Sequence, residues 1–292
     1  MKYTVLSLFP EICDAYFASS IMAKAVKAGF VEYRAINIRD YAFDKHRTCD
    51  DAPYGGGAGM LMLPEPLGRA LEAAGAKNKE QRTIINKQLA IGNDQGTGSN
   101  SAPPPLLTVN RPRVVYLSPS GRPFNQALAK ELAAEKELIL LCGRYEGIDQ
   151  RIIDTYVDDE ISVGDYVLSS GEVAALVLID ATYRLLEQVI TPASLEEESF
   201  SGGLLEYPQY TRPDIYATIH GELKVPEILL SGHHENIRRW RLEKRVEKTL
   251  AVRPDLLQNG TFTLGKECFQ FDDEVLKIIG QKRREMRGEG EE

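Results

Sequence analysis

The chain has 292 residues, 43% of them hydrophobic, with a formal net charge of −8 and a mean hydropathy of −0.28. This length is enough for one large domain or two smaller ones with their own apolar cores. Its apolar runs are far shorter than the ~20 residues of a membrane-spanning helix, so we expect neither an integral membrane protein nor a membrane partner.

The first part of the chain alternates between strand and helix patterns. The run "YTVLSLF" from Tyr3 predicts a first strand rather than a leader peptide, because no long apolar region with a cleavage site is present. Pro10 and Gly29 suit the start and the end of one following helix. The next expected elements are a strand at "YRAINI" (33–38), the loop "YGGGAGM" (54–60) and a helix from about Pro64 to Ala74.

Two continuous apolar runs follow further along the chain. They are "RVVYLS" (113–118) and "ELILLC" (137–142), on either side of an alanine-rich helix pattern at about 126–136. Strands that are apolar on both faces and separated by helices are typical of a parallel sheet covered by helices on both sides. The sequence therefore predicts an α/β fold for this part of the chain.

Two irregular stretches suggest where the domains divide. Residues 76–112 contain "GNDQGTGSNSAPPP", which cannot bury apolar surface and predicts a flexible insertion. Residues 191–214 are rich in carboxylates and aromatic rings, and helical patterns dominate after them. We expect an α/β domain at 1–190, an interdomain loop at 191–214 and a small all-helical domain at 215–292.

The cysteines and the common nucleotide motifs exclude several classes of protein. The four cysteines are scattered, without a C-x-x-C pair or matching histidines, which argues against a zinc site or a disulfide framework and favours reduced thiols in a cytoplasmic protein. "GTFTLGKE" (260–267) matches a phosphate-binding loop except that Glu267 replaces the hydroxyl that would hold magnesium. A nucleotide hydrolase built on it is a rival that we do not favour. No G-x-G-x-x-G follows the first strand, and no G-x-S-x-G occurs.

Three glycine-bearing segments each end an apolar run. They are "YLSPSG" (116–121), "CGRYEGID" (142–149) and "VGDYVLSSGE" (163–172). Ligands of open α/β sheets bind outside the carboxyl ends of the strands. Each segment alone is also typical of an ordinary turn between strand and helix. Together they predict a site for a flat, polar ligand with an apolar rim.

A basic segment lies near the carboxyl end. Residues 233–253 contain seven Lys and Arg against three Glu, despite the acidic charge of the whole chain. Such a segment is typical of a solvated helix face with internal ion pairs. It is also compatible with contact to nucleic-acid phosphates.

Seven motifs, in order, resemble those of the bacterial tRNA (guanine-N1)-methyltransferase family, TrmD, of the SPOUT superfamily. They are "SLFPE", "DKHRTCDDAPYGGGAGM", "YLSPSGRP", "LCGRYEGIDQR", "SVGDYVLSSGE", "GLLEYPQYTRP" and "LLSGHHENIRRWR". The similarity covers nearly the whole chain, and residues 76–112 add length that shorter members of the family lack.

The resemblance implies a parallel sheet with a deep trefoil knot and a homodimer with active sites between subunits. It also implies that S-adenosylmethionine, the methyl donor, binds at the three glycine-bearing segments. Ser170 and Ala174 depart from the family, which often has Gly and Pro there. The implied cofactor-binding residues are Tyr116, Leu117, Ser118, Gly143, Tyr145, Glu146, Val163, Gly164, Asp165, Tyr166, Val167, Leu168 and Gly171.

The implied reaction methylates N1 of guanosine-37 in tRNA, directly 3′ of the anticodon. N1 of neutral guanine carries a proton, so a base must remove it and the charge developing on O6 must be stabilised. The resemblance assigns the base to Glu198, where the family has Asp, and the O6 contact to Arg184. Glu196 and Glu197 are adjacent alternatives, and the run "EEE" is also typical of a solvated surface.

The expected macromolecular partner is tRNA. The resemblance implies a flipped guanine, for which the loops "YGGGAGM" and "EYPQYTRP" are our candidate pocket, while the basic segment around Trp240 contacts phosphates. One rival is a knotted methyltransferase of ribose 2′-hydroxyls, which "GLLEYPQYTRP" and the segment after it disfavour. Another is an RNA-binding protein that has lost catalysis through the change to Glu198. No sequence feature predicts a metal site, although the reaction is compatible with a divalent ion.

Overall fold

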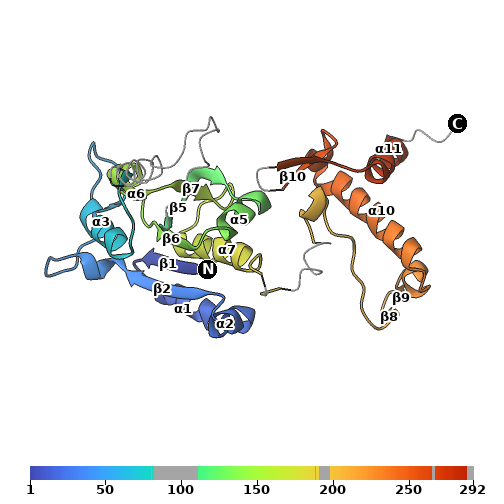
Figure 1. Ribbon diagram of the computed structural model, residues 1–292, viewed down its shortest axis with the longest axis horizontal. Coiled ribbons are helices and arrows are strands. Elements are labelled where there is room, and N and C mark those ends of the chain that lie inside the picture. The colour runs from blue at the N-terminus through green and yellow to red at the C-terminus, as the bar shows by residue number, and fades with distance from the viewer. Residues whose placement is uncertain (80, 82–110, 188, 191–197, 265–266, 288–292) are drawn as a thin grey trace, which may run out of the picture. The chain divides into compact units, whose positions relative to one another are not determined.

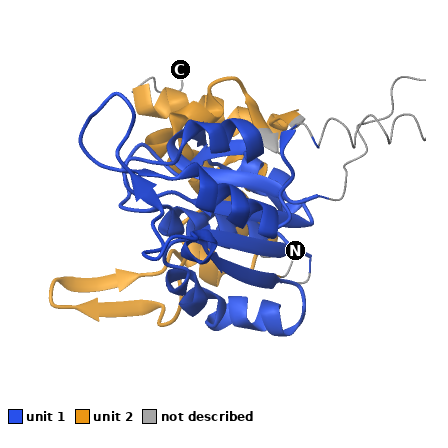
Figure 2. Cartoon of the chain, turned by 90° about the vertical axis from the view of Figure 1, so that its left-hand side faces the viewer, with its two compact units in different colours: residues 1–189 blue, residues 190–292 orange. Residues whose placement is uncertain are grey.

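The structure, a computed structural model, describes all residues except 80, 82–110, 188, 191–197, 265–266 and 288–292 (Figure 1). The chain divides into two compact units, unit 1 at Met1–Val189 and unit 2 at Ile190–Glu292 (Figure 2). Most of the Gly/Ser/Pro-rich stretch and residues Glu196 and Glu197 lie outside the described residues.

Unit 1 is built on a parallel five-stranded sheet, as expected (Figure 1). The order of the strands is β2-β1-β6-β5-β7, and every pairing is parallel. Consequently all five carboxyl ends lie at one edge. The strands are β1 (Lys2–Ser7), β2 (Glu32–Asn37), β5 (Arg113–Pro123), β6 (Glu137–Cys142) and β7 (Asp159–Ser162).

The sheet separates two apolar cores. Side chains alternate between the faces of a strand, so Leu138, Leu140 and Cys142 enter one core while Ile139 and Leu141 enter the other. The first core is covered by α1 (Glu11–Phe17), α2 (Ser20–Lys27), α5 (Gln126–Ala133) and α7 (Gly171–Tyr183). The second is covered by η1 (Ile38–Tyr41), α3 (Pro64–Ala73) and α6 (Gln150–Tyr156). Between η1 and α3 in the sequence, β3 (Asp50–Asp51) and β4 (Leu61–Met62) form a short antiparallel pair of strands.

The single helix expected between Pro10 and Gly29 is wrong, because two helices, α1 and α2, occupy this segment. Ser19 is extended and Ser20 has a φ of +52°, so the helical hydrogen-bond ladder cannot continue. The hydroxyl of Ser19 donates to the carbonyl of Ala15 (2.6 Å), which satisfies an acceptor at the end of α1. Serine competes with helical backbone bonds in this way.

The all-helical carboxyl-terminal domain is also wrong, because unit 2 contains two antiparallel hairpins. Each strand has only four residues, too few for a period to stand out in the sequence. Gly221, with a φ of +123°, allows the tight turn of the first hairpin. Phe262 in the second packs on Phe269 and Phe271, with ring centroids 5.6 and 5.2 Å apart.

Unit 2 contains a third core, to which α10, η3 and α11 contribute, and its elements follow in chain order. They are η2 (Ser201–Gly203), β8 (Ile215–Thr218), β9 (Gly221–Lys224), α9 (Glu227–Leu230), α10 (His234–Val252), η3 (Pro254–Leu257), β10 (Thr261–Leu264), β11 (Glu267–Gln270) and α11 (Asp273–Arg287). Val246 and Leu250 of α10 meet Val275, Ile278 and Ile279 of α11 in this core. None of the helices that the structure describes combines the length and the apolar character needed to cross a membrane.

Candidate functional site

A cavity of about 390 Å³ lies in unit 1 at the carboxyl ends of β5, β6 and β7. Its walls come from three segments far apart in the sequence, at 116–120, 143–147 and 161–171. They meet because β5 lies between β6 and β7 in the sheet. Of the thirteen expected cofactor-binding residues, all except Asp165 line the cavity. The others that line it are Pro119, Ser120, Arg144, Gly147, Ile161, Ser162, Ser169, Ser170 and Ala174.

Close backbone packing explains the small residues in two of these walls. The amide of Gly171 donates to the carbonyl of Gly143 (2.9 Å). A Cβ atom added to Gly171 would lie 2.7 Å from the Cα of Cys142, and one added to Gly143 would lie 2.9 Å from the ring of Tyr116. Neither contact is compatible with a side chain unless neighbouring atoms move. These glycines are therefore needed for the shape of the cavity.

Two tyrosines that line the cavity differ in how far they are buried. Tyr116 is buried, and burial raises the pKa of its phenol to about 12, so the ring stays neutral at ordinary pH. The nearby backbone of Ile148 lowers this pKa, but by less than burial raises it. Tyr145 is 45% exposed and adopts a left-handed conformation with a φ of +59°. Such strained residues concentrate at functional sites, because the surrounding structure must hold them in place.

The loop "YGGGAGM" (54–60) lies against the second wall of the cavity. The amide of Glu146 donates to the carbonyl of Met60 (3.1 Å), and the amide of Met62 donates to that of Gly147 (3.0 Å). Gly59 has a φ of +89°, and a Cβ atom there would lie 2.4 Å from the side chain of Glu146. Glycine therefore lets this loop approach Glu146. The other loop expected to hold the guanine, "EYPQYTRP" (206–213), belongs to unit 2.

The motif "SLFPE" supports the cavity, although we assigned it no site residue from the sequence. Ser7 hydrogen-bonds Glu172, which follows directly after the cavity residue Gly171. The guanidinium of Arg144 lies 4.5 Å from the ring centroid of Phe9, within the range of a cation–π contact. The motif begins at the end of a strand, at the edge where parallel sheets bind ligands, and this position was a usable signal.

The two expected catalytic residues come from different units. Arg184 directly follows α7 in unit 1. Glu198 lies in unit 2 just before η2, where its carbonyl accepts a hydrogen bond from the amide of Ser201 (3.1 Å). Among the described residues, no three His, Cys, Asp or Glu side chains are grouped closely enough to hold a metal ion.

Most cations of the basic segment in α10 are paired within unit 2. Arg238 bonds Glu235 and Glu274, Arg239 bonds Glu243, and Lys244 bonds Glu247. Arg245 donates to the carbonyls of Leu205 and Ser201, and Arg241 lies over the ring of Tyr207. Lys248 is exposed and makes no ion pair within the part of the chain that the structure describes. The segment therefore combines the internal pairs of a solvated helix with at least one cation open to a ligand.

The sequence of the chain matches one family model over most of its length. The model is described as tRNA (Guanine-1)-methyltransferase TrmD and matches residues 1–102 and 104–259. A tRNA (guanine-N(1)-)-methyltransferase of Treponema denticola is 54% identical over 285 residues, which cover 98% of this chain and 100% of the relative. Proteins of the same name from Treponema pallidum and Borreliella burgdorferi are 52% and 51% identical over 257 and 258 residues. These matches cover 88% of this chain and 88% and 92% of the relatives.

Proposed function

The chain belongs to the tRNA (guanine-1)-methyltransferase family, TrmD, and on that premise we propose that it methylates N1 of guanosine-37 in tRNA with S-adenosylmethionine as the methyl donor. It is a transferase that modifies guanine in tRNA. We propose the position of the methylated nucleotide, the methyl donor and the catalytic residues. We also propose a cytoplasmic location, because tRNA is the substrate.

The cavity of unit 1 is the observation that supports the cofactor. Its volume of about 390 Å³ falls within the roughly 300–1,000 Å³ typical of small-molecule sites. Leu117, Ile161 and Ala174 supply apolar walls, and the glycines leave backbone groups accessible to a polar ligand. These features fit a nucleoside that carries an amino-acid side arm. Once bound, S-adenosylmethionine supplies a methyl group already activated by a positively charged sulfur.

The protein must then prepare the acceptor. We assign Glu198 as the general base whose carboxylate removes the N1 proton of guanine. A positioned general base typically contributes ~10²–10⁴-fold to the rate. Arg184 donates to O6, where negative charge develops as the proton leaves. Its guanidinium is permanently charged and has planar donors, which suits this contact.

An exposed apolar face of α7 supports a homodimer. The sequence of this helix, "GEVAALVLIDATY", is apolar on nearly every side, which is typical of a helix that is fully buried. Nevertheless Val173 and Val177, one turn apart, are 50% and 44% exposed. Ile12 of α1, the helix that packs against α7, is also exposed. A second copy covering this face would bury all three side chains, and we propose that the active sites form between the subunits.

The close association of β5, β7 and the segment after β7 supports the trefoil knot. These strands pair through Leu117 and Ile161, separate over residues 118–121, and pair again at Arg122 and Ile161. Between these pairings Gly121 lies so close to β7 that a Cβ atom would be 2.4 Å from the amide nitrogen of Ile161. The next segment along the chain then returns to hydrogen-bond Gly143 through Gly171. We propose that the chain is knotted where these segments meet.

Methyl transfer from labelled S-adenosylmethionine to two tRNA transcripts tests the function. One transcript carries guanosine at position 37 and the other carries adenosine there. We expect label only on the guanosine transcript and a loss of ~10²–10⁴-fold in rate for Glu198→Gln. Equal labelling of both transcripts would point to another base or to ribose. Cofactor binding with no labelling of either would favour an RNA-binding protein without catalysis.

A further inference from the structure

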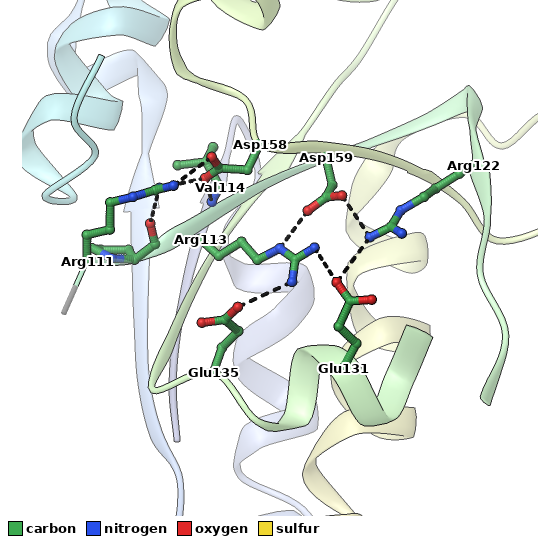
Figure 3. Close-up of polar contacts among 9 residues, drawn as sticks. Arg111, Arg113, Val114, Arg122, Glu131, Glu135, Asp158 and Asp159 are labelled. Carbon is green, nitrogen blue, oxygen red and sulfur yellow. Dashed lines mark hydrogen bonds and ion pairs between the residues drawn. The ribbon is translucent and has the colours of Figure 1, made fainter. Parts of the chain in front are cut away.

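A network of charged side chains links both ends of β5 to β7 and α5 (Figure 3). Asp159 of β7 lies at its centre and accepts hydrogen bonds from Nε of Arg113 (2.6 Å) while pairing with Nη2 of Arg122 (2.7 Å). Glu131 of α5 bonds Arg113 (2.7 Å) and lies 3.7 Å from Arg122. Glu135 bonds the other side of Arg113 (3.2 Å). One carboxylate of β7 is thus held by two arginines from opposite ends of β5.

The residues between these two arginines include one wall of the cavity. β5 leaves its register with β7 after Leu117 and returns to it at Arg122, so residues 118–121 bulge out of the sheet. Ser118, Pro119 and Ser120 in this bulge line the cavity. The sheet defines where the bulge starts. Its far end is held by the pairing of Arg122 and Pro123 with β7, by the amide of Phe124, which donates to the carbonyl of Ser162 (2.8 Å), and by the side chain of Arg122.

The two arginines have different roles in the network. The side chain of Arg113 is 18% exposed and bonds three carboxylates, so it holds β5, β7 and α5 together. The side chain of Arg122 is 45% exposed, and among the described residues it forms ion pairs only with carboxylates that Arg113 also binds. Because exposed ion pairs contribute little to stability, loss of Arg122 should leave unit 1 folded. It should loosen the far end of the bulge, where the backbone pairing with β7 remains.

We propose that Arg122, held by Asp159, positions the Ser118–Gly121 wall of the cavity for binding of S-adenosylmethionine. Arg122 acts through the backbone of this wall and not by touching the reacting atoms. The proposal deepens the proposed function and rests on it for the identity of the ligand. A wall that is already in place does not have to be ordered when the ligand binds, so the affinity is higher.

The test measures S-adenosylmethionine binding to the full chain by calorimetry, together with hydrogen exchange of the amides of Ser118, Ser120 and Gly121. For Arg122→Met we expect the dissociation constant to rise about tenfold and these amides to exchange faster in the free protein. The midpoint of thermal unfolding should change by no more than about 2 °C, since exposed pairs are weak. Arg122→Lys should restore part of the affinity, because the ammonium still pairs with Asp159.

The matched control is Arg69→Met, which removes a half-buried arginine from an ion pair with Glu65 elsewhere in unit 1. It should leave cofactor affinity and the exchange of the bulge unchanged. In turnover with tRNA, Arg122→Met should raise KM for S-adenosylmethionine about tenfold and leave kcat at saturating cofactor within about twofold, a split that general destabilisation does not produce.

Unchanged affinity and unchanged exchange in Arg122→Met would overturn the proposal. So would a loss of affinity that only follows a fall in the unfolding midpoint, as expected for the structural residue Arg113. If the unsubstituted protein fails to bind S-adenosylmethionine, the proposed function is wrong. Faster exchange of the bulge in Arg122→Met would then still support the role of Arg122 in holding this wall.

Discussion

The hydroxyl of Ser7 donates a hydrogen bond to Oε1 of Glu172, which joins the end of β1 to the first turn of α7 across 165 positions of sequence. The same hydroxyl accepts a bond from the amide of Phe9 (2.7 Å). Glu172 is 1% exposed, and its Oε2 has no hydrogen-bond partner among the described residues. Ser7 thus supplies a direct partner for a carboxyl group beneath the cavity.

Ser7→Ala should destabilise the protein. The substitution removes the donor to Glu172 and the acceptor of the Phe9 amide, and an unsatisfied buried polar group costs about 1–3 kcal/mol. We expect a loss of this size in the free energy of unfolding, measured by urea titration. Ser19→Ala is the control, because its exposed hydroxyl bonds only the carbonyl of Ala15, and it should change this free energy by less than about 0.5 kcal/mol. Equal effects of the two substitutions would contradict the prediction.

Gly171→Ala should damage the cavity. Its Cβ atom would lie 2.7 Å from the Cα of Cys142, and the three nearest atoms all belong to the backbone of Cys142 and Gly143, so no flexible side chain can move away. We expect binding of S-adenosylmethionine to weaken at least tenfold, about 1.4 kcal/mol, measured by calorimetry. Gly143→Ala should be milder, because its Cβ atom meets the side chain of Tyr116 instead of backbone.

The control for these glycines is Gly280→Ala in α11, where a Cβ atom would have nothing within 4 Å. Alanine in a helix interior is more favourable than glycine by about 0.5–1 kcal/mol. Gly280→Ala should therefore raise the free energy of unfolding slightly and leave cofactor binding unchanged. If Gly171→Ala behaved like this control, the argument from close packing would be wrong.

Stability should fall at high pH partly because of Tyr116. Burial raises the pKa of its phenol to about 12 in the folded protein, against about 10 in the unfolded chain. The contribution of this group to stability is therefore complete below pH 10 and is lost as pH rises from about 10 through about 12. The loss of stability is at most ~2.7 kcal/mol, because the pKa values of the folded and unfolded states differ by about two units. Urea unfolding at pH 9 and pH 11.5 measures it.

Tyr116→Phe separates this effect from the other tyrosines. Phenylalanine does not titrate, so the variant should lose less stability between pH 9 and pH 11.5 than the unsubstituted protein. At pH 9, where the phenol of the unsubstituted protein is neutral, the two proteins should differ in stability only through the missing hydroxyl group. Identical pH dependence in both proteins would show that Tyr116 ionises without a cost to the fold.

Lys248 should contribute more than Arg238 to binding of tRNA. Lys248 is exposed, with no ion pair in the described portion of the chain, whereas Arg238 already bonds Glu235 and Glu274. Lys248→Gln should weaken binding and lower the slope of log affinity against log salt by about 1, as expected for one lost phosphate contact. Arg238→Gln should have the smaller effect, because a phosphate must first displace two carboxylates. Filter binding at several salt concentrations measures both, and the reverse order would contradict the prediction.

Several elements of unit 1 could be predicted from local pattern. The run "ELILLC" forms β6 over Glu137–Cys142 as expected, and the helix expected from about Pro64 to Ala74 runs from Pro64 to Ala73. A glycine follows closely after each segment, Gly143 after the strand and Gly75 after the helix. The pattern failed for the break at Ser19 and Ser20 and for the two hairpins of unit 2. In these places short segments take their conformation from side-chain hydrogen bonds and from packing instead of from a sustained period.

Local patterns in the sequence were enough to predict the apolar strands and the glycine-bearing breaks after them, and the ordered motifs were enough to identify the family. Only the tertiary structure decided that residues 116–120, 143–147 and 161–171 share one cavity, since this depends on β5 lying between β6 and β7. The tertiary structure also decided that Ser7 meets Glu172 and that Arg122 meets Asp159. The physical reason is that local composition reports whether a residue is buried and how its backbone bends. Partners distant in the sequence depend on the order of strands and on the packing of helices over them.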